Sequence, residues 1–282
     1  MQVIDFHTHI FAPEVIAQRE RYCQRDSWFQ LLYGKPKARM ATVEKLIASM
    51  DEAGVAGSVV FGFAFADMGL CREGNAYVLE AAARYPGRLF PFAAVNPACP
   101  KEALREARAC LEKGAQGIGE LMPDGQGFTL TSFEMLDPLM ELARAYEVPV
   151  MIHVNEQVGH YYAGKGKFGP REAYLLALHY PENTLVFPHW GGGLPFYELM
   201  PEVQAALQRV YYDTAATHYL YRDAIFEQVA SWTKRILWGT DYPLISQKRS
   251  LRRVRALRLA PEVLERVLGG NALAILARGG GS

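Results

Sequence analysis

Short apolar runs alternate with helical stretches along the whole chain, and this alternation limits the possible folds most strongly. Eight runs read as β-strands, namely Val3–Phe6, Ser58–Phe63, Leu89–Val95, Gly117–Leu121, Val148–Val154, Thr184–Pro188, Val210–Asp213 and Arg235–Gly239. Each strand-plus-helix unit takes about 30 residues, which is the length of a unit that joins two parallel strands through a helix. Nearly continuous apolar runs such as Val148–Ile152 are typical of parallel strands covered on both faces. Eight such units predict a (β/α)8 TIM barrel, with its functional site at the C-terminal ends of the strands.

The stretches between the strands have helical periodicity and end at glycine or proline. We expect helices over Thr42–Ala53, Asn75–Arg84, Lys101–Lys113, Phe133–Tyr146, Arg171–Leu178, Phe196–Gln208, Arg222–Trp232 and Leu251–Leu276, the last broken near Pro261 and near Gly269-Gly270. A doubly wound open sheet is the alternative fold. It requires a glycine-rich phosphate loop after the first strand, where this chain has His7-Thr8-His9.

The barrel is expected to form one domain over residues 1–278, followed by a flexible tail at 279–282. Residues 10–39 form an unusually long connection between the first strand and the first helix, and they are rich in aromatic residues. Connections of this length are usually functional, so the segment is either a lid or pocket wall, or a helical excursion packed on the rim. Its four arginines are candidates to hold a substrate carboxylate: Arg19, Arg21, Arg25 and Arg39.

Composition excludes several classes of function. The 282 residues include 30 basic and 30 acidic side chains, so the chain lacks the positive surface that nucleic acid or an anionic membrane would attract. The four cysteines are scattered without a CxxC motif, which indicates free thiols in a reducing compartment. No uninterrupted run of about 18 apolar residues occurs, and the N-terminus lacks the pattern of a signal peptide. We therefore expect a cytoplasmic protein.

His7 and His9 follow the first strand directly and are separated by one residue. Positions i and i+2 of a strand share a face, so both imidazoles are expected to point to one place. Two converging imidazoles on a rigid strand are a common beginning of a transition-metal site, although a chance pair on a solvated strand has the same pattern.

Other residues with suitable chemistry also stand at the ends of predicted strands. These are Glu120 on strand four, His153 on strand five, His189 on strand six and Asp241 on strand eight. A set of imidazoles and carboxylates suits Zn²⁺, with Fe²⁺, Mn²⁺ and Ni²⁺ as competitors. Because strands one and eight of a closed barrel are neighbours, Asp241 is expected beside the histidine pair, where it could accept a proton from water.

Five motifs in this order resemble the amidohydrolase superfamily: Asp5–His9, Ile152-His153, His189–Phe196, Tyr212–Thr214 and Gly239–Pro243. The chain is similar to the branch that contains aminocarboxymuconate-semialdehyde decarboxylase, resorcylate decarboxylases and many metal-dependent hydrolases. The motifs span residues 5–243, so the resemblance covers nearly the whole chain.

The resemblance implies roles for particular residues. His7, His9 and His153 match metal ligands, and Asp241 matches a ligand that doubles as proton acceptor. His189 matches a histidine that orients water or substrate when one metal is bound and binds the second metal when two are bound. Glu120 departs from the family pattern, because members with two metals often carry a carboxylated lysine there. Glu120 is either a ligand or an outer partner of another side chain, and one or two metals remain open.

Three functional hypotheses follow. The first is a metal-dependent hydrolase in which water attacks a carbonyl carbon, with Asp241 and His189 as catalytic residues. The second is a non-oxidative decarboxylase that uses the same metal on a small aromatic or unsaturated acid. A non-catalytic binding barrel is the third, and it would predict missing ligands. We expect a small-molecule substrate as the only partner, with a homodimer as one open form of assembly. The expected substrate contacts are His160, Tyr161, Asn155 and Trp190.

Overall fold

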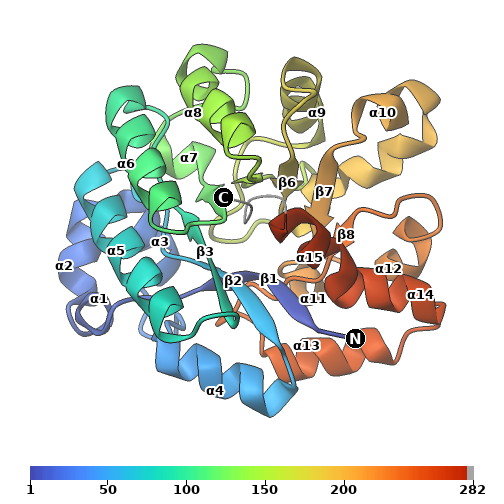
Figure 1. Ribbon diagram of the computed structural model, residues 1–282, viewed down its shortest axis with the longest axis horizontal. Helices are drawn as coiled ribbons and strands as arrows, with labels where there is room; N and C mark the ends of the chain where they lie inside the picture. The colour runs from blue at the N-terminus through green and yellow to red at the C-terminus, as the bar shows by residue number, and fades with distance from the viewer. Residues whose placement is uncertain (278–282) are drawn as a thin grey trace.

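The computed structural model describes residues 1–277, and in it eight parallel strands form a barrel surrounded by helices (Figure 1). The strands are β1 (Ile4–His9), β2 (Gly57–Phe61), β3 (Leu89–Ala93), β4 (Gly117–Leu121), β5 (Val150–Ile152), β6 (Leu185–Phe187), β7 (Val210–Asp213) and β8 (Ile236–Leu237). They pair in sequence order, each parallel to the next. The predicted TIM barrel is confirmed, whereas the predicted tail at 279–282 lies outside the described residues.

Backbone hydrogen bonds between β1 and the residues that follow β8 complete the ring. The amide of Phe6 donates to Trp238 O at 2.8 Å, and the amide of His9 donates to Tyr242 O at 2.7 Å. In return, the amide of Asp241 donates to His7 O at 3.0 Å. Asp241 therefore lies beside the histidine pair, as the closed barrel predicts.

Strand β1 has a shift in register between Asp5 and Thr8, which marks a bulge in its pairing with β2. A bulge re-aims the side chains that follow it. Phe6 packs against Phe92 in the core cluster, while the next residue, His7, faces the other histidines at the strand ends. The bulge thus lets consecutive residues serve the core and the candidate site.

The surrounding helices largely follow the expected ranges. They are α4 (Val43–Ala53), α5 (Met68–Arg84), α6 (Pro100–Glu112), α7 (Pro123–Gln126), α8 (Phe133–Ala145), α9 (Pro170–His179), α10 (Pro201–Ala206), α11 (Thr217–Leu220), α12 (Ala224–Val229) and α13 (Gln247–Arg255). Helix α5 begins seven positions before its predicted start at Asn75, because Asp67 caps it by accepting from the amides of Gly69 and Leu70.

Two predicted helix boundaries are wrong. Instead of one helix over Phe196–Gln208, a 3-10 segment runs over His189–Leu199 and α10 follows after an extended Met200. The predicted break near Gly269 is also absent, since α14 (Pro261–Glu265), a π-helical turn and α15 (Asn271–Leu276) are continuous. A Cβ atom on Gly269 would lie 1.9 Å from Gln2 O, so this glycine permits a close approach and does not end a helix.

Residues 10–39 form three short helices, α1 (Pro13–Ala17), α2 (Arg19–Arg25) and α3 (Ser27–Tyr33). An aromatic cluster holds them to the barrel: Phe29 is fully buried and its ring packs against Phe11, Phe63 and Phe65. Within residues 1–277, no helix combines the length and the hydropathy needed to cross a bilayer.

The tight barrel interior yields a stability prediction. A Cβ atom on Gly117 of β4 would lie 2.4 Å from the Phe92 ring, so Gly117→Ala should lower the free energy of unfolding by about 1–3 kcal/mol. Gly74 in α5 has open space around its Cβ position, so Gly74→Ala should raise it by at most about 1 kcal/mol. Urea unfolding of both variants checks this, and equal midpoints for Gly117→Ala and the unmodified protein would contradict it.

Candidate metal centre

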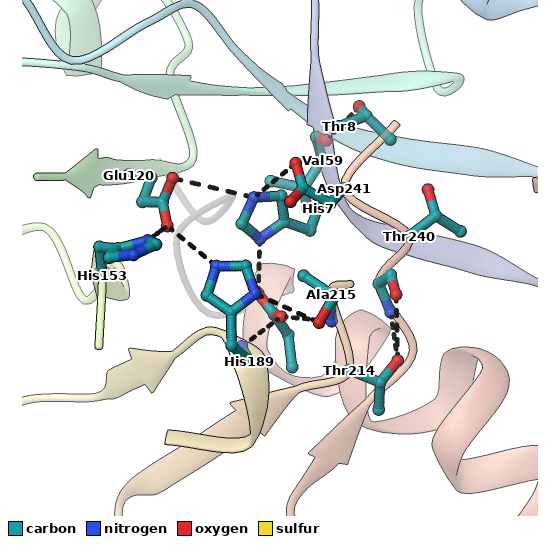
Figure 2. Close-up of polar contacts among 12 residues, drawn as sticks. His7, Thr8, Val59, Glu120, His153, His189, Thr214, Ala215, Thr240 and Asp241 are labelled. Carbon is teal, nitrogen blue, oxygen red and sulfur yellow. Dashed lines mark hydrogen bonds and ion pairs between the residues drawn. The ribbon is translucent and has the colours of Figure 1, made fainter. Parts of the chain in front are cut away.

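Six side chains from five strand ends meet at the carboxyl end of the barrel. Figure 2 shows His7, Glu120, His153, His189 and Asp241 of this set. Their ligand atoms fall into two groups, and within each group the atoms lie within 4.8 Å of one another. The first group contains His7, His9 and Asp241, and the second contains Glu120, His153 and His189. All six are buried except the partly buried Asp241. The structure therefore brings together every residue that the sequence placed in the metal site.

Three of the imidazoles are held in one tautomer by oxygen atoms that can only accept hydrogen bonds. Nδ1 of His7 bonds to Asp213 Oδ2 at 2.8 Å, Nδ1 of His9 to Gly62 O at 3.1 Å, and Nδ1 of His189 to Ala215 O at 3.2 Å. In each neutral ring Nδ1 must carry the hydrogen, which leaves Nε2 as a bare acceptor. All three Nε2 atoms are therefore available as metal ligands.

His153 is oriented the other way round. Its Nε2 lies 3.0 Å from Oδ1 of Asn155, and the amide of Gly166 donates to the same oxygen at 2.6 Å. Since that oxygen accepts, Nε2 of His153 carries the hydrogen, and Nδ1 is bare only in the neutral ring. This Nδ1 lies 2.8 Å from Oε1 of Glu120, and although burial lowers the pKa of His153, that carboxylate raises it more strongly. Nδ1 therefore faces the site and can hold either a proton or a metal ion.

The bare atoms face one another, and this arrangement requires a positive charge between them. Nε2 of His7 and Nε2 of His9 are 3.2 Å apart, and neither carries a hydrogen in the neutral ring. Burial lowers the pKa of His7, but Asp213 and Glu120 raise it more strongly, to about 10. A proton or a metal ion can supply the missing charge. The donor set therefore fits a divalent transition metal, whose ligands are imidazole nitrogens and carboxylate oxygens.

Both carboxylates of the centre are ionised. Burial raises the pKa of Glu120, but the imidazoles of His153 and His7 outweigh it and hold that pKa at about 2. Asp241 is affected in the same way: burial opposes ionisation, while the nearby imidazoles of His9 and His7 hold its pKa well below the usual range. Both groups can therefore act as anionic ligands or proton acceptors.

Glu120 lies between the two groups of ligands. Its Oε2 is 3.8 Å from Nε2 of His7 and 4.0 Å from Nε2 of His9, whereas Oε1 faces His153 at 2.8 Å and His189 at 4.0 Å. One oxygen thus faces each group. Glu120 could therefore offer one ligand oxygen to an ion held by either group.

Asp213 and Asp5 support the centre from outside, and sequence reasoning assigned neither a role. Asp213 is fully buried at the end of β7, and its Oδ1 accepts from the amides of His189 and Ala215. Asp5 accepts from the amide and hydroxyl of Thr240, the residue before Asp241. Both aspartates lie within recognised motifs, and their positions at strand ends beside ligand histidines are the signal that could have identified them.

A cavity of about 420 Å³ opens in front of the centre. Its wall is mostly apolar or aromatic and includes Leu32, Tyr33, Phe63, Met122 and Leu220. Residues 10–39 therefore form part of the cavity wall.

Among residues 1–277, Arg39 is the one arginine that lines this cavity. The other candidates in residues 10–39 point elsewhere: Arg19 bonds to Lys35 O, Arg21 pairs with Glu14, and Arg25 pairs with Asp67. Arg39 is thus the best placed of the four to meet a bound anion.

The predicted substrate contacts divide into two pairs. Asn155 and His160 line the cavity. Tyr161 is 78% exposed and does not line it, because the loop turns this side chain outward. Trp190 is fully buried in the core, where Nε1 donates to Thr217 Oγ1 at 2.9 Å and the ring packs against Phe226. Its position therefore indicates a packing role, whereas Tyr33, which the sequence did not single out, faces the cavity.

Strained backbone occurs at two of these side chains. His189 and Asp241 have φ values of 56° and 61°, in the left-handed region that residues other than glycine rarely adopt. Trp190 and the three glycines after it continue in this conformation. Such strain concentrates at functional sites, where surrounding contacts hold it in place.

The fold and the site together define the class of this protein: it is a (β/α)8 barrel with a candidate metal centre at the ends of its strands. Residues 4–278 match the sequence profile of the family described as amidohydrolase, so the chain belongs to the amidohydrolase family. No curated protein matches it in sequence.

Several solved structures share the fold at low sequence identity. A putative amidohydrolase from Staphylococcus aureus has a TM-score of 0.75 and 21% identity, over 98% of this chain and 100% of that chain. The structure of 5-carboxyvanillate decarboxylase from Sphingomonas paucimobilis has a TM-score of 0.77 and 17% identity, over 98% of this chain and 99% of that chain. The 5-carboxyvanillate decarboxylase from Novosphingobium aromaticivorans was solved in complex with manganese and a nitrobenzoic acid. It has a TM-score of 0.75 and 18% identity, over 98% of this chain and 96% of that chain. These similarities support the fold.

The hydrogen bond between Asp213 and His7 yields a prediction about metal affinity. The Asp213 carboxylate orients His7 and makes this imidazole more basic. Asp213→Asn removes that negative charge, so the affinity for Zn²⁺ should fall about 10- to 100-fold. Competition with a chromophoric chelator measures the affinity. Asp51→Asn, at a surface pair with Arg88, is the control and should leave it unchanged. An unaltered affinity in Asp213→Asn would show that Asp213 does not support the centre.

Proposed function

We propose that the protein is a metal-dependent hydrolase that acts on a small molecule and holds two divalent ions, with Zn²⁺ as the first choice. The position of Glu120 carries this proposal, because its two oxygens face the two groups of ligands. His7, His9 and Asp241 would hold one ion, and His153 and His189 would hold the other. Divalent ions in such a site supply Lewis acidity and lower the pKa of water to near neutrality.

The protein's own residues supply proton transfer and orientation. Asp241 is ionised and 3.4 Å from His9, so it can accept a proton from water at the mouth of the centre and return it to the leaving group. Burial and the charge of His153 lower the pKa of His189, which therefore stays neutral with Nε2 bare. His189 is thus suited to bind an ion or accept a proton, and it is less suited to donate to a substrate carbonyl.

The cavity favours a substrate with an apolar or aromatic body and an anionic group. Apolar side chains dominate its wall, and Arg39 provides a guanidinium beyond the centre. Arginine binds carboxylates through paired hydrogen bonds, which would orient the substrate with its other end toward the ligands. We propose in addition that one domain carries the site, that the protein works in the cytoplasm, and that residues 10–39 cover the bound substrate.

Decarboxylation is the second candidate reaction. The observation that favours it is the apolar cavity with one guanidinium, which would also suit an aromatic acid such as those named for the decarboxylases of similar fold. In this reaction the bond between the ring carbon and the carboxylate breaks, CO₂ leaves, and a proton is added to the carbon. Asp241, after protonation, could deliver that proton, because it lines the cavity.

The proposed role of Glu120 can be tested by metal content. The protein purified without chelator and then loaded with Zn²⁺ should retain about two equivalents, in keeping with a two-ion centre. Glu120→Gln should retain about one, because the neutral amide loses the negative charge that both groups of ligands share. Glu102→Gln, at a surface pair with Arg72, is the control and should match the unmodified protein. Equal stoichiometry in all three proteins would reject the shared role.

The two reactions can be separated with a panel of aryl carboxylic acids, lactones and amides that bear a carboxylate. Hydrolysis in H₂¹⁸O should place ¹⁸O in the product with no release of CO₂, and Asp241→Asn should lower the rate about 10²- to 10⁴-fold. Mass spectrometry follows both products. Release of CO₂ without incorporation of ¹⁸O would replace the proposed hydrolase with the decarboxylase.

A further inference from the structure

The loop after β5 is tied directly to the candidate ligand His153. Asn155 begins this loop and is almost completely buried. Its Oδ1 accepts from Nε2 of His153 at 3.0 Å and from the amide of Gly166 at 2.6 Å, and its Nδ2 donates to the hydroxyl of Tyr162 at 3.0 Å. The side chain of Asn155 therefore connects the His153 imidazole to Tyr162 and to Gly166 of the same loop.

The rest of the loop is held together through Tyr162. Its hydroxyl donates to Oε2 of Glu156 at 3.2 Å, and Nζ of Lys165 lies 3.5 Å from Oε1 of the same carboxylate. Lys165 also donates to Val158 O at 2.7 Å and lies over the Tyr162 ring. Residues 156–168 are thus one hydrogen-bonded unit whose inner end is Asn155.

Two glycines pack closely against Asn155. A Cβ atom on Gly192 would lie 2.2 Å from Asn155 O, and one on Gly166 would lie 2.8 Å from Asn155 Oδ1 and 2.2 Å from Asp124 Oδ2. Only glycine permits these approaches. Two glycines therefore enclose Asn155 from the loop side and from the strained segment after β6.

The same loop forms one wall of the cavity. His160, Tyr162, Ala163 and Gly164 all line it, and a Cβ atom on Gly164 would lie 2.7 Å from Cδ2 of Leu32 in α3. The loop and residues 10–39 therefore meet across the cavity. Any change in the order of the loop changes the surface that a substrate meets.

We propose that Asn155 and Tyr162 are positioning residues that couple the order of residues 156–168 to metal occupancy at His153. An ion bound at Nδ1 makes Nε2–H a stronger donor, which strengthens its bond to Asn155 and fixes the loop. By thermodynamic reciprocity, the ordered loop holds the imidazole in place and strengthens metal binding by the same factor. A loaded centre would thus give a more rigid cavity wall. This inference rests on the proposed metal centre.

Hydrogen exchange measures the coupling without a substrate. The full-length protein is stripped with a chelator, reloaded with Zn²⁺, and compared in both forms by mass spectrometry of peptides covering residues 156–168. Zn²⁺ should slow exchange of the Gly166 amide about fivefold or more, a typical size for coupling between sites. Equal exchange in the stripped and the reloaded protein, when the reloaded protein is shown to hold Zn²⁺, would overturn the inference. The proposed metal centre would then still stand.

Neighbouring tyrosines provide a matched pair of variants. Tyr162→Phe removes the hydroxyl that links Asn155 to Glu156, whereas Tyr161→Phe removes an exposed hydroxyl outside the cavity. Tyr162→Phe should reduce the protection given by Zn²⁺ and speed release of Zn²⁺ to a chelator about fivefold, and Tyr161→Phe should match the unmodified protein. Identical behaviour of the two variants would overturn the coupling. Failure of the unmodified protein to bind any ion would overturn the proposed function and this inference together.

Discussion

The orientation of four imidazoles is the constraint on which the candidate site depends. Each ring uses its outer nitrogen to donate to a fixed oxygen, from Asp213, Gly62, Ala215 or Asn155, and so presents a bare inner nitrogen. Four lone pairs and two carboxylates then converge in a buried space. Without a cation this arrangement is electrostatically unfavourable, and with one it becomes a preorganised ligand set. The outer partners therefore define the site as much as the ligands do.

The barrel makes this convergence possible by placing strand ends side by side. Backbone hydrogen bonds from the segment after β8 to β1 bring Asp241 next to His7, and the bulge in β1 turns His7 and His9 toward the same space while Phe6 remains in the core. The left-handed backbone at His189 and Asp241 completes the arrangement. Close packing at glycines, as at Gly192 against Asn155, lets the loops approach the ligands without a gap.

Much of this architecture could be predicted from the sequence, because strand periodicity and strand-end chemistry are local patterns. All eight strands and the six ligand candidates lie where the patterns indicate. The errors come from long-range packing: Gly269 resembles a helix stop but accommodates Gln2, and Trp190 follows a ligand histidine but turns into the core. The role of Asp213 also required coordinates, because it depends on a hydrogen bond to a ring whose orientation no sequence pattern specifies.

The central claim is that the converging imidazoles and carboxylates exist to hold divalent cations. Crystals grown without chelator, soaked in Mn²⁺ and measured for anomalous scattering, test it most directly. The account predicts two anomalous peaks, one among His7, His9 and Asp241 and one among Glu120, His153 and His189. The absence of anomalous density at both groups, in crystals where the six side chains are ordered, would contradict it.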